Sequence, residues 1–339
     1  MIRIGIVGVG FMGWIHWLGA KKLRGARVTA ISSRDAKKRA GDWRSIRGNF
    51  GPPGEQVDLS KIKAYETVEQ LLEDPDIDLV DICNPTDLHP ETAIAALHAG
   101  KHVLVEKAIA LTAQDADAML AAAKKSGKLL MVAHVLPFVP EYAFAAEVVR
   151  TGKYGKLLAA TFQRIISKPD WSQEIGDAGK TGGPAVDLHI HDTHFIGLLC
   201  GVPREVFSTG VVDRGTVVHV TTQYLYGKNG PSIACTSGAL TSKARPFIHS
   251  FELFLEKATL IFTGTSPLRV LVANGRVYEP KLKGGGDPTA AFTAEIQTAV
   301  NGVVAGKAPD LLSAQLARDA LVLCHKEIES VKTGKAVAV

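Results

Sequence analysis

The chain has 339 residues, with 39 Lys and Arg against 34 Asp and Glu, which gives a formal net charge of +5. Hydrophobic residues make up 46% of the sequence and charged residues 22%, which is ordinary for a globular protein and excludes a disordered chain. No block of Lys and Arg resembles a nucleic-acid-binding arm, so nucleic acid is excluded as a primary partner. At about 150 residues per domain, the length predicts two domains or one large one.

Several features favour a cytoplasmic protein. The longest apolar stretch, Leu129–Val139, is interrupted by His134 and Pro137 and is too short to span a membrane. The N-terminus enters an alternating pattern at once, without the features of a signal peptide. The cysteines are Cys83, Cys200, Cys235 and Cys324. Their spacing fits neither a disulfide scaffold nor a zinc site, and we interpret them as reduced core thiols.

Residues 1–134 alternate short runs rich in β-branched residues with helical patterns, which indicates a parallel sheet covered on both faces. The predicted strands are Ile2–Val7, Arg27–Ile31, Lys61–Tyr65, Leu79–Cys83, His102–Glu106 and Leu129–Ala133. The predicted helices are Met12–Leu23, Ala36–Asp42, Val68–Glu73, Pro90–Ala99 and Ala113–Ser126. Six strands with five crossovers predict a doubly wound Rossmann domain that binds a dinucleotide. The stretch Arg44–Asp58 has turn chemistry and no apolar period, and predicts a surface insertion.

Residues 135–339 show a different pattern, in which one helix, Glu141–Arg150, precedes long alternating runs. The predicted strands are Leu157–Ile166, Val206–Val212, Val217–Tyr226, Ile233–Ser237, Ile248–Glu256 and Thr259–Thr263. Links such as Gly227-Lys228-Asn229-Gly230 are typical of hairpin turns, and two helices, Ala290–Ala305 and Ser313–Thr333, follow. We therefore predict an α+β domain with a large, mostly antiparallel open sheet. The ligand site is expected in a crevice at the carboxyl ends of the parallel strands.

A glycine loop, Gly8-Val9-Gly10-Phe11-Met12-Gly13, follows the first predicted strand and opens the first helix. The first glycine permits a tight turn, the second allows the backbone to approach a pyrophosphate, and the third allows the helix to pack closely on the strand. The helix N-terminus then meets the phosphate charge. Because strand, loop, helix and second strand have the required spacing, the loop predicts dinucleotide binding.

The end of the second strand bears on the choice between NAD and NADP. NAD enzymes usually carry an acidic residue there that binds the ribose 2′-OH, whereas this chain has Ser32-Ser33-Arg34. Without a carboxylate a 2′-phosphate is not repelled, and Arg34 can pair with it, so NADP is favoured over NAD. In the alternative interpretation Ser33 and Arg34 form a solvated turn and Asp35 caps the next helix. Asp35 is also close enough to replace the missing carboxylate.

Polar residues gather at two further places. Asn84-Pro85 and His89 follow the fourth strand, and Glu106-Lys107 ends the fifth, where an ammonium group can meet a substrate oxygen. In the second part, a helix over 187–194 would place Asp187, His191 and His194 on one face, with His189 pointing elsewhere.

These residues resemble the Gfo/Idh/MocA oxidoreductase family, which includes glucose–fructose oxidoreductase and inositol dehydrogenase. The resemblance covers essentially the whole chain: the glycine loop, the Asn84-Pro85 turn with His89, the run from Ala99 to Lys107, and the Gly-Gly, Asp, His arrangement that ends at His191. It implies that Lys107 is the active-site lysine, Asp187 a substrate-binding and catalytic aspartate, and His191 the general base. Imidazole is suited to exchange the proton of a secondary alcohol while hydride passes to nicotinamide.

The predicted site follows from the motifs and the resemblance together. The expected catalytic residues are Lys107, Asp187 and His191, with no metal. The expected cofactor-binding residues are Gly8, Gly10, Phe11, Met12, Gly13, Ser33, Arg34, Asn84, Pro85, His89, Glu106 and Lys107. The expected substrate is a sugar, a cyclitol or a related polyhydroxylated compound, and family members commonly form dimers or tetramers through the open sheet.

Departures and alternatives remain. The usual family proline after Glu-Lys is Ala108, which argues against a cis peptide there. His189 and His194 replace family residues, and with His191 and Asp192 they allow a metal site as an alternative. Trp171 and Tyr142 are candidates for stacking on a sugar, with core packing as the alternative. A cofactor-binding regulator and an NAD-dependent glycosidase are the alternative functions.

Overall fold

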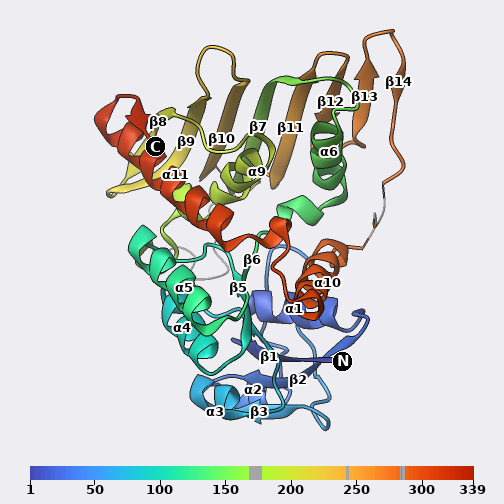
Figure 1. The fold of residues 1–339 in the computed structure, drawn as a ribbon, viewed down its shortest axis with the longest axis vertical. Helices are drawn as coiled ribbons and strands as arrows, with labels where there is room; N and C mark the ends of the chain where they lie inside the picture. Colours follow the sequence, from blue (N-terminus) through green and yellow to red (C-terminus); the bar gives the residue numbers. More distant parts are fainter. Residues whose placement is uncertain (168–177, 242–243, 283, 285–286) are drawn as a thin grey trace. The chain divides into compact units, whose positions relative to one another are not determined.

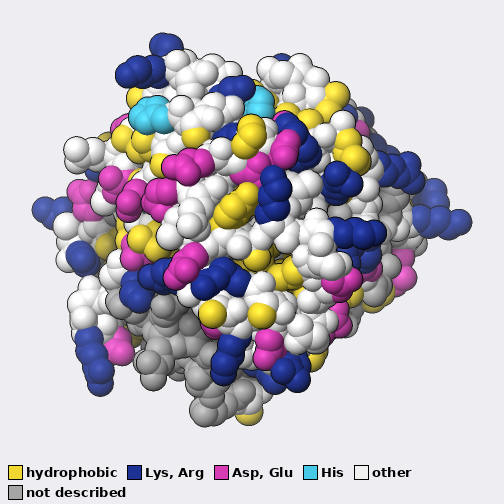
Figure 2. Space-filling model, turned by 90° about the horizontal axis from the view of Figure 1, so that it is seen from below, with side chains coloured by type: hydrophobic (Ala, Val, Ile, Leu, Met, Phe, Trp, Pro, Cys, Tyr) yellow, Lys and Arg dark blue, Asp and Glu magenta, His cyan; other side chains and the backbone are white. Residues whose placement is uncertain are grey.

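The computed structural model describes the chain except for residues 168–177, 242–243, 283 and 285–286. It divides into two compact units, each made of two stretches of sequence: 1–138 with 286–318, and 139–285 with 319–339. None of the helices in the described ranges combines the length and the apolar character that a membrane crossing requires. On the face drawn in Figure 2, Lys and Arg side chains intermingle with those of Asp and Glu.

The first unit is built on a six-stranded sheet in the order β3-β2-β1-β4-β5-β6, in which every neighbouring pair is parallel. Its strands are β1 (Ile2–Val7), β2 (Ala26–Ser32), β3 (Lys63–Tyr65), β4 (Leu79–Ile82), β5 (His102–Glu106) and β6 (Leu130–Ala133). The central strands are apolar runs, as is typical of strands covered on both faces. The predicted Rossmann sheet is confirmed.

Helices cover this sheet. They are α1 (Phe11–Ala20), α2 (Ala36–Arg39), α3 (Val68–Glu73), α4 (His89–His98), α5 (Ala113–Ser126) and α10 (Ala290–Ala305), with the 3-10 turns η1 (Thr86–Leu88), η2 (Leu136–Phe138) and η3 (Asp310–Leu312). A capping box of Thr67 and Gln70 begins α3, and Gly127 in the left-handed region ends α5. Helix α10 lies beside α1 (Figure 1), and Phe292 and Ile296 join the core around Trp14. A helix that the sequence places in the second domain therefore belongs to the first unit.

The stretch predicted as a surface insertion is partly a core element. Trp43, Ile46 and Val57 are buried in the same core as α1, and the Trp43 ring packs edge-on against Trp14 and Trp17. Backbone hydrogen bonds from Trp43 N–H to Glu55 O and from Val57 N–H to Gly41 O close the loop. The sequence pattern missed this packing because Trp43 lies just before the predicted stretch, while Gly and Pro residues separate Ile46 from Val57 and leave no period.

The second unit is built on a nine-stranded sheet in the order β14-β13-β12-β11-β7-β10-β9-β8-β15. Its strands are β7 (Leu157–Ser167), β8 (Glu205–Asp213), β9 (Thr216–Leu225), β10 (Ser232–Thr241), β11 (Ile248–Leu255), β12 (Ala258–Phe262), β13 (Arg269–Val272), β14 (Val277–Tyr278) and β15 (Val337–Ala338). Only the β7–β10 pair is parallel among the pairings described. The predicted open, mostly antiparallel sheet is confirmed, and β13 to β15 are additions to it.

One face of this sheet carries helices (Figure 1). They are α6 (Pro140–Thr151), α7 (Ala178–Thr181), α8 (Pro184–Asp187), α9 (Ile190–Cys200) and α11 (Ala314–Thr333), of which α11 begins with residues of the first unit. Strand residues alternate between buried and exposed positions, so that Val206, Tyr224 and Leu253 are buried whereas their neighbours Phe207 and Leu225 are exposed. The sheet therefore presents apolar side chains on its other face.

Candidate active site

The glycine loop has the shape that a pyrophosphate requires. Gly8 has a φ of +92°, and a Cβ there would lie 2.7 Å from the backbone nitrogen of Asn84. A Cβ on Gly13 would overlap the carbonyl oxygen of Gly8. A Cβ on Gly10, in contrast, would meet no atom within 4 Å. Gly8 and Gly13 thus serve the fold, while Gly10, at the N-terminus of α1, borders open space that a phosphate can fill.

The Ser33-Arg34 turn is held from behind by Arg39. The Arg39 guanidinium donates to the carbonyl oxygens of Ser33, at 2.8 Å, and Arg34, at 3.0 Å. Asp35 caps α2, because its carboxylate accepts the N–H of Lys37 at 2.8 Å. The side chain of Arg34 is exposed. The Asp35 carboxylate is therefore already engaged by the backbone, and the basic side chain of Arg34 faces solvent.

His89 joins two strand-end loops within the first unit. Its Nδ1 lies 2.7 Å from the carbonyl oxygen of Ala108, and its Nε2 lies 3.0 Å from that of Asn84. Burial lowers the pKa of His89, so the ring is neutral near pH 7. The Lys107–Ala108 peptide bond is cis, which corrects the sequence-based expectation. The His89 ring contacts the carbonyl oxygen of Ala108, the second residue of this peptide bond. The cis geometry thus occurs beside a tertiary contact and without a proline.

Glu106 and Lys107 form the end of β5. Glu106 is buried, and one of its carboxylate oxygens accepts the N–H of Lys107 at 3.0 Å. Its other oxygen lies 3.0 Å from Nε2 of His16, a histidine on α1. The Lys107 side chain is half-buried. The backbone that carries the lysine is thus tied to a buried carboxylate, which is tied in turn to a buried imidazole.

The segment around His191 differs from the expected single helix over 187–194. Helix α8 ends at Asp187 and α9 begins at Ile190, with His189 turned into the core between them. Asp187 and His191 are half-buried, whereas His194 is fully buried. Burial also lowers the pKa of His194 to about 3, so this ring stays neutral. The structure therefore separates His194, a core residue, from Asp187 and His191.

Two buried ion pairs flank His191. Arg164 on β7 contacts Asp192 through Nε and Oδ2 at 2.6 Å and through Nη2 and Oδ1 at 3.2 Å. His189 contacts Glu327 on α11 through Nε2 and Oε2 at 2.8 Å, while its Nδ1 lies 2.8 Å from the Ser237 hydroxyl. Because His189 and Asp192 are already paired, the alternative of a metal site formed by the histidine-rich segment loses two of its ligands.

Of the two aromatic candidates for sugar stacking, the structure tests only Tyr142. Tyr142 is fully buried, with its ring packed against Phe195, Phe251 and Phe262, so it is a core residue. Trp171 lies outside the described residues.

Comparison with known proteins supports the family resemblance. Residues 2–134 match the profile of the GFO_IDH_MocA oxidoreductase family, described as having an NAD-binding Rossmann fold. Over these residues the chain is similar to the Gfo/Idh/MocA oxidoreductases. The chain is 31% identical to 1,5-anhydro-D-fructose reductase of Ensifer adhaerens, over 57% of this chain and 54% of that protein. It is also 31% identical to myo-inositol 2-dehydrogenase of Thermotoga maritima, over 62% of this chain and 59% of that protein. The chain thus matches little more than half the length of these relatives.

A solved structure extends the likeness of the fold to both units. Levoglucosan dehydrogenase, in complex with NADH and levoglucosan, superimposes with a TM-score of 0.85 over 100% of this chain and 99% of that chain, at 20% identity. The Gfo/Idh/MocA resemblance stated from sequence is therefore confirmed, and so is the fold class. Lys107 belongs to the first unit and Asp187 and His191 to the second, so their meeting in one site is part of the proposed function.

Sequence analysis missed the buried polar residues behind the Gfo/Idh/MocA motifs. They are His16, Asp81, Glu295, Arg164 and Glu327. A signal was present for three of them, because His16, Asp81 and Glu295 each interrupt an otherwise apolar segment. A charged residue in a buried strand or on the buried face of a helix needs a partner.

Proposed function

We propose that this chain is an NAD(P)-dependent oxidoreductase that transfers a hydride between nicotinamide and a carbon of a sugar, cyclitol or related polyhydroxylated substrate. The observation that carries this proposal is the cradle at Gly10, open at the N-terminus of α1 within a domain of an NAD-binding family. The names of the two relatives, a reductase of an anhydro sugar and a dehydrogenase of inositol, support the substrate class.

The three proposed catalytic residues have chemistry that suits this reaction. Nicotinamide supplies a hydride acceptor or donor when the cofactor is bound. His191 exchanges the proton of the reacting hydroxyl, since an unperturbed imidazole titrates near neutral pH. Lys107 stabilises the negative charge that develops on that oxygen, and Asp187 orients the substrate or the imidazole. This proposal assigns substrate binding to the second unit, with Asp187 and His191 meeting Lys107 at the carboxyl ends of the parallel strands.

Residues of the first unit would hold the cofactor. The proposed contacts run from the pyrophosphate at the glycine loop to the nicotinamide end beside Glu106 and Lys107. They comprise Gly8, Gly10, Phe11, Met12, Gly13, Asn84, Pro85, His89, Glu106 and Lys107. Ser33 and Arg34 would bind the ribose end, and we propose a preference for NADP because Arg34 is exposed and Asp35 is engaged as a helix cap. Replacing Arg34 with Ala is expected to weaken NADP binding about 10-fold and to leave NAD binding nearly unchanged.

The open face of the nine-stranded sheet supports a second part of the proposal, a homodimer or homotetramer. Phe207, Val211, Leu225 and Phe254 are exposed large apolar side chains on neighbouring or nearby strands. Exposed apolar side chains that share one face of a sheet are typical of interaction sites. Sedimentation analysis of the wild type and of Phe207→Lys tests it: the substitution is expected to shift the population toward monomer, and an unchanged oligomer would reject this interface.

The activity is tested with a panel of polyols and aldoses, each assayed at about 340 nm, where the reduced nicotinamide absorbs, with both cofactors. Lys107→Ala and His191→Ala are expected to lower turnover about 100-fold or more. Lys124→Ala and His98→Ala, which change exposed side chains of the same types, are the matched controls. If both active-site variants keep the rate of the wild type, the catalytic assignment is wrong.

The panel also separates the two alternative functions, neither of which gains support from the relatives above. A regulator would bind cofactor and turn over none of the substrates. A glycosidase would cleave a glycoside while the cofactor remains bound and is not consumed.

A further inference from the structure

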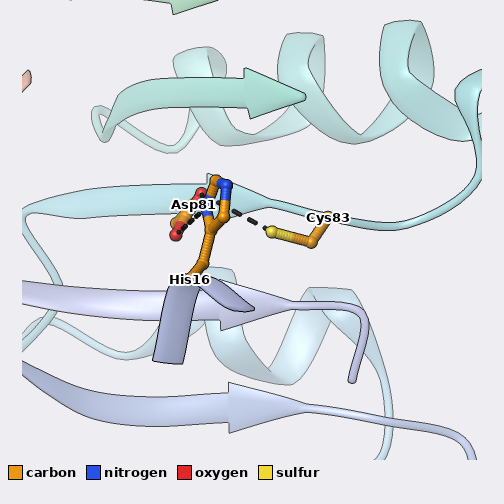
Figure 3. Close-up of side chains that lie close together, drawn as sticks. All are labelled: His16, Asp81 and Cys83. Carbon is orange, nitrogen blue, oxygen red and sulfur yellow. Dashed lines mark hydrogen bonds and ion pairs between the residues drawn. The ribbon is translucent and has the colours of Figure 1, made fainter. Parts of the chain in front are cut away.

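A buried cluster of titratable groups lies within the first unit, next to the proposed lysine. We call it the His16 cluster, and it consists of His16, Asp81, Cys83 and Glu106. His16 has no exposed surface, and Asp81 is 1% exposed. Figure 3 shows the His16 ring reaching from α1 to the Asp81 side chain on β4, with the Cys83 sulfur beside them. The motifs that define the proposed site do not account for this cluster.

The geometry of the cluster is that of hydrogen-bonded ion pairs. Nδ1 of His16 lies 3.0 Å and 2.9 Å from the two oxygens of Asp81, and Nε2 lies 3.0 Å from Oε1 of Glu106. Ionised carboxylates only accept hydrogen bonds, so the ring satisfies both of them only when both of its nitrogens carry hydrogen. Burial by itself would lower the pKa of His16, but the Asp81 carboxylate outweighs it, and the pKa lies well above its ordinary value.

His16, Asp81 and Cys83 lie close enough together to suggest a metal site, but their chemistry argues against one. To bind a metal ion, His16 would need a ring nitrogen without hydrogen, and Cys83 would need to be a thiolate. Both ring nitrogens of His16 face carboxylates, and burial raises the pKa of the Cys83 thiol, which keeps it protonated. The Cys83 sulfur lies 3.7 Å from Asp81 Oδ1, a distance that suits a weak thiol donor.

We propose that His16 is a positioning residue, which as an imidazolium clamps Glu106 so that this carboxylate holds the backbone of Lys107 in place. The link is continuous: Asp81 fixes one side of the ring, the ring fixes Oε1 of Glu106, and Oε2 of Glu106 accepts the N–H of Lys107 at 3.0 Å. This inference rests on the proposed function, because it assigns His16 to the support of the proposed catalytic lysine. It extends the site from the strand-end loop into the core.

Other titratable groups face the cluster from the surrounding elements. They are Glu295 on α10, His89 on α4 and Lys107 itself. Glu295 is fully buried, and burial, together with the Glu106 charge, raises its pKa well above its ordinary value. Glu295 is therefore a neutral acid. Glu295 makes no hydrogen bond within the described part of the chain, so it serves as a matched buried carboxyl that is not a link of the clamp.

The protonation state of His16 is tested first, on cofactor-free protein. The protein is labelled with ¹⁵N-histidine, and its spectrum is recorded at about pH 8.5, two units above the ordinary histidine pKa of about 6.5. The wild type and Glu295→Gln are expected to show an imidazolium signal that His16→Gln lacks. A neutral ring signal for His16 at this pH overturns the proposal, and so does one bound zinc per wild-type chain that His16→Gln loses.

The link to Lys107 is tested by kinetics on whichever substrate the panel identifies. His16→Gln and Glu106→Gln are each expected to lower kcat about 10- to 100-fold with little change in the KM for substrate. In the double variant the two amide side chains can form a neutral hydrogen bond across the clamp. Its kcat is therefore expected to fall no further than the kcat of the less impaired single variant. The proposal is overturned if the losses of kcat in the two single variants multiply in the double variant. It is also overturned if Glu295→Gln lowers kcat as much as His16→Gln does.

The two proposals fail in different ways. If no substrate is turned over, the proposed function fails. The clamp is then judged by the ¹⁵N signal and by NADH affinity, which is measured from fluorescence and is expected to fall several-fold in both single variants but not in Glu295→Gln.

Discussion

The two units support their proposed catalytic groups in parallel ways. In the first unit, Lys107 follows Glu106, a buried carboxylate held by the cation of His16. In the second unit, His191 precedes Asp192, a buried carboxylate held by the cation of Arg164. The cations differ: a guanidinium keeps its charge at any pH at which proteins fold, whereas an imidazolium loses its proton. The support of His191 is therefore insensitive to pH, whereas the support of Lys107 is sensitive to it.

The charge balance of the two networks also differs. Arg164 and Asp192 form a one-to-one pair, and so do His189 and Glu327. In the first unit a single imidazolium lies between two carboxylates, Asp81 and Glu106.

The largest expected effect follows from breaking the pair beside His191. Asp192→Ala leaves the buried guanidinium of Arg164 without its carboxylate, which is expected to lower the free energy of unfolding by about 3–5 kcal/mol. The loss should be the same at about pH 6 and pH 8.5, because Arg keeps its charge over that range. Urea unfolding measures it. A double variant, Arg164→Met with Asp192→Leu, is the control and should regain much of the loss; a loss that varies strongly with pH contradicts the comparison.

A smaller, pH-dependent effect is expected at the second pair of the same unit. Burial alone would lower the pKa of His189, but Glu327 outweighs it and raises it above its ordinary value. The stabilisation from this pair is complete below about pH 6.5 and is lost as the pH rises through the raised folded-state pKa. Glu327→Gln is therefore expected to cost about 1.5–3 kcal/mol at pH 6, with a cost that shrinks at alkaline pH. Urea unfolding at a series of pH values checks this, and a constant cost would show that His189 is neutral.

A third variant concerns acid stability of the second unit. Burial lowers the pKa of His194 to about 3. An unfolded histidine takes up a proton near pH 6.5, while the folded ring stays neutral, so this group lowers stability by about 1.4 kcal/mol for each pH unit below 6.5. His194→Gln should remove this pH dependence. The free energy of unfolding should then fall less between about pH 7 and pH 5 than it does in the wild type, by about 2 kcal/mol. Equal pH slopes in the two proteins would show that His194 is already protonated in the fold.

The smallest effect on stability is expected in the first unit, at Gly10. Gly10→Ala adds a methyl group to open space, so the melting temperature should stay the same, whereas the affinity for NADH should fall about 10-fold or more. Gly13→Ala is the matched contrast, since its Cβ would overlap Gly8 and the fold itself should lose stability. Thermal melts with and without NADH separate the effect on stability from the effect on binding. If Gly10→Ala keeps full NADH affinity, the pyrophosphate does not bind at this loop.

The sequence predicted the parallel strands of the first unit almost residue by residue, because their apolar runs and turns are local features. The catalytic roles of Lys107, Asp187 and His191 came from the resemblance to the Gfo/Idh/MocA family and stay predictions. The sequence did not predict the break between α8 and α9, where His189 turns inward to Glu327, more than 130 positions further along the chain. The clamp was missed for the same reason: His16, Asp81 and Glu106 are remote in sequence, and they become partners only when the fold brings α1, β4 and β5 together.

The proposed function has Lys107 and His191 act on one substrate oxygen. A crystal structure of the protein with NAD(P)H and a substrate from the panel tests it most directly. The account predicts that Lys107 Nζ and a ring nitrogen of His191 both lie within about 3–3.5 Å of the oxygen on the carbon that faces nicotinamide C4. A structure in which the two nitrogens face separate spaces, or in which the dinucleotide lies away from Gly10, would contradict it.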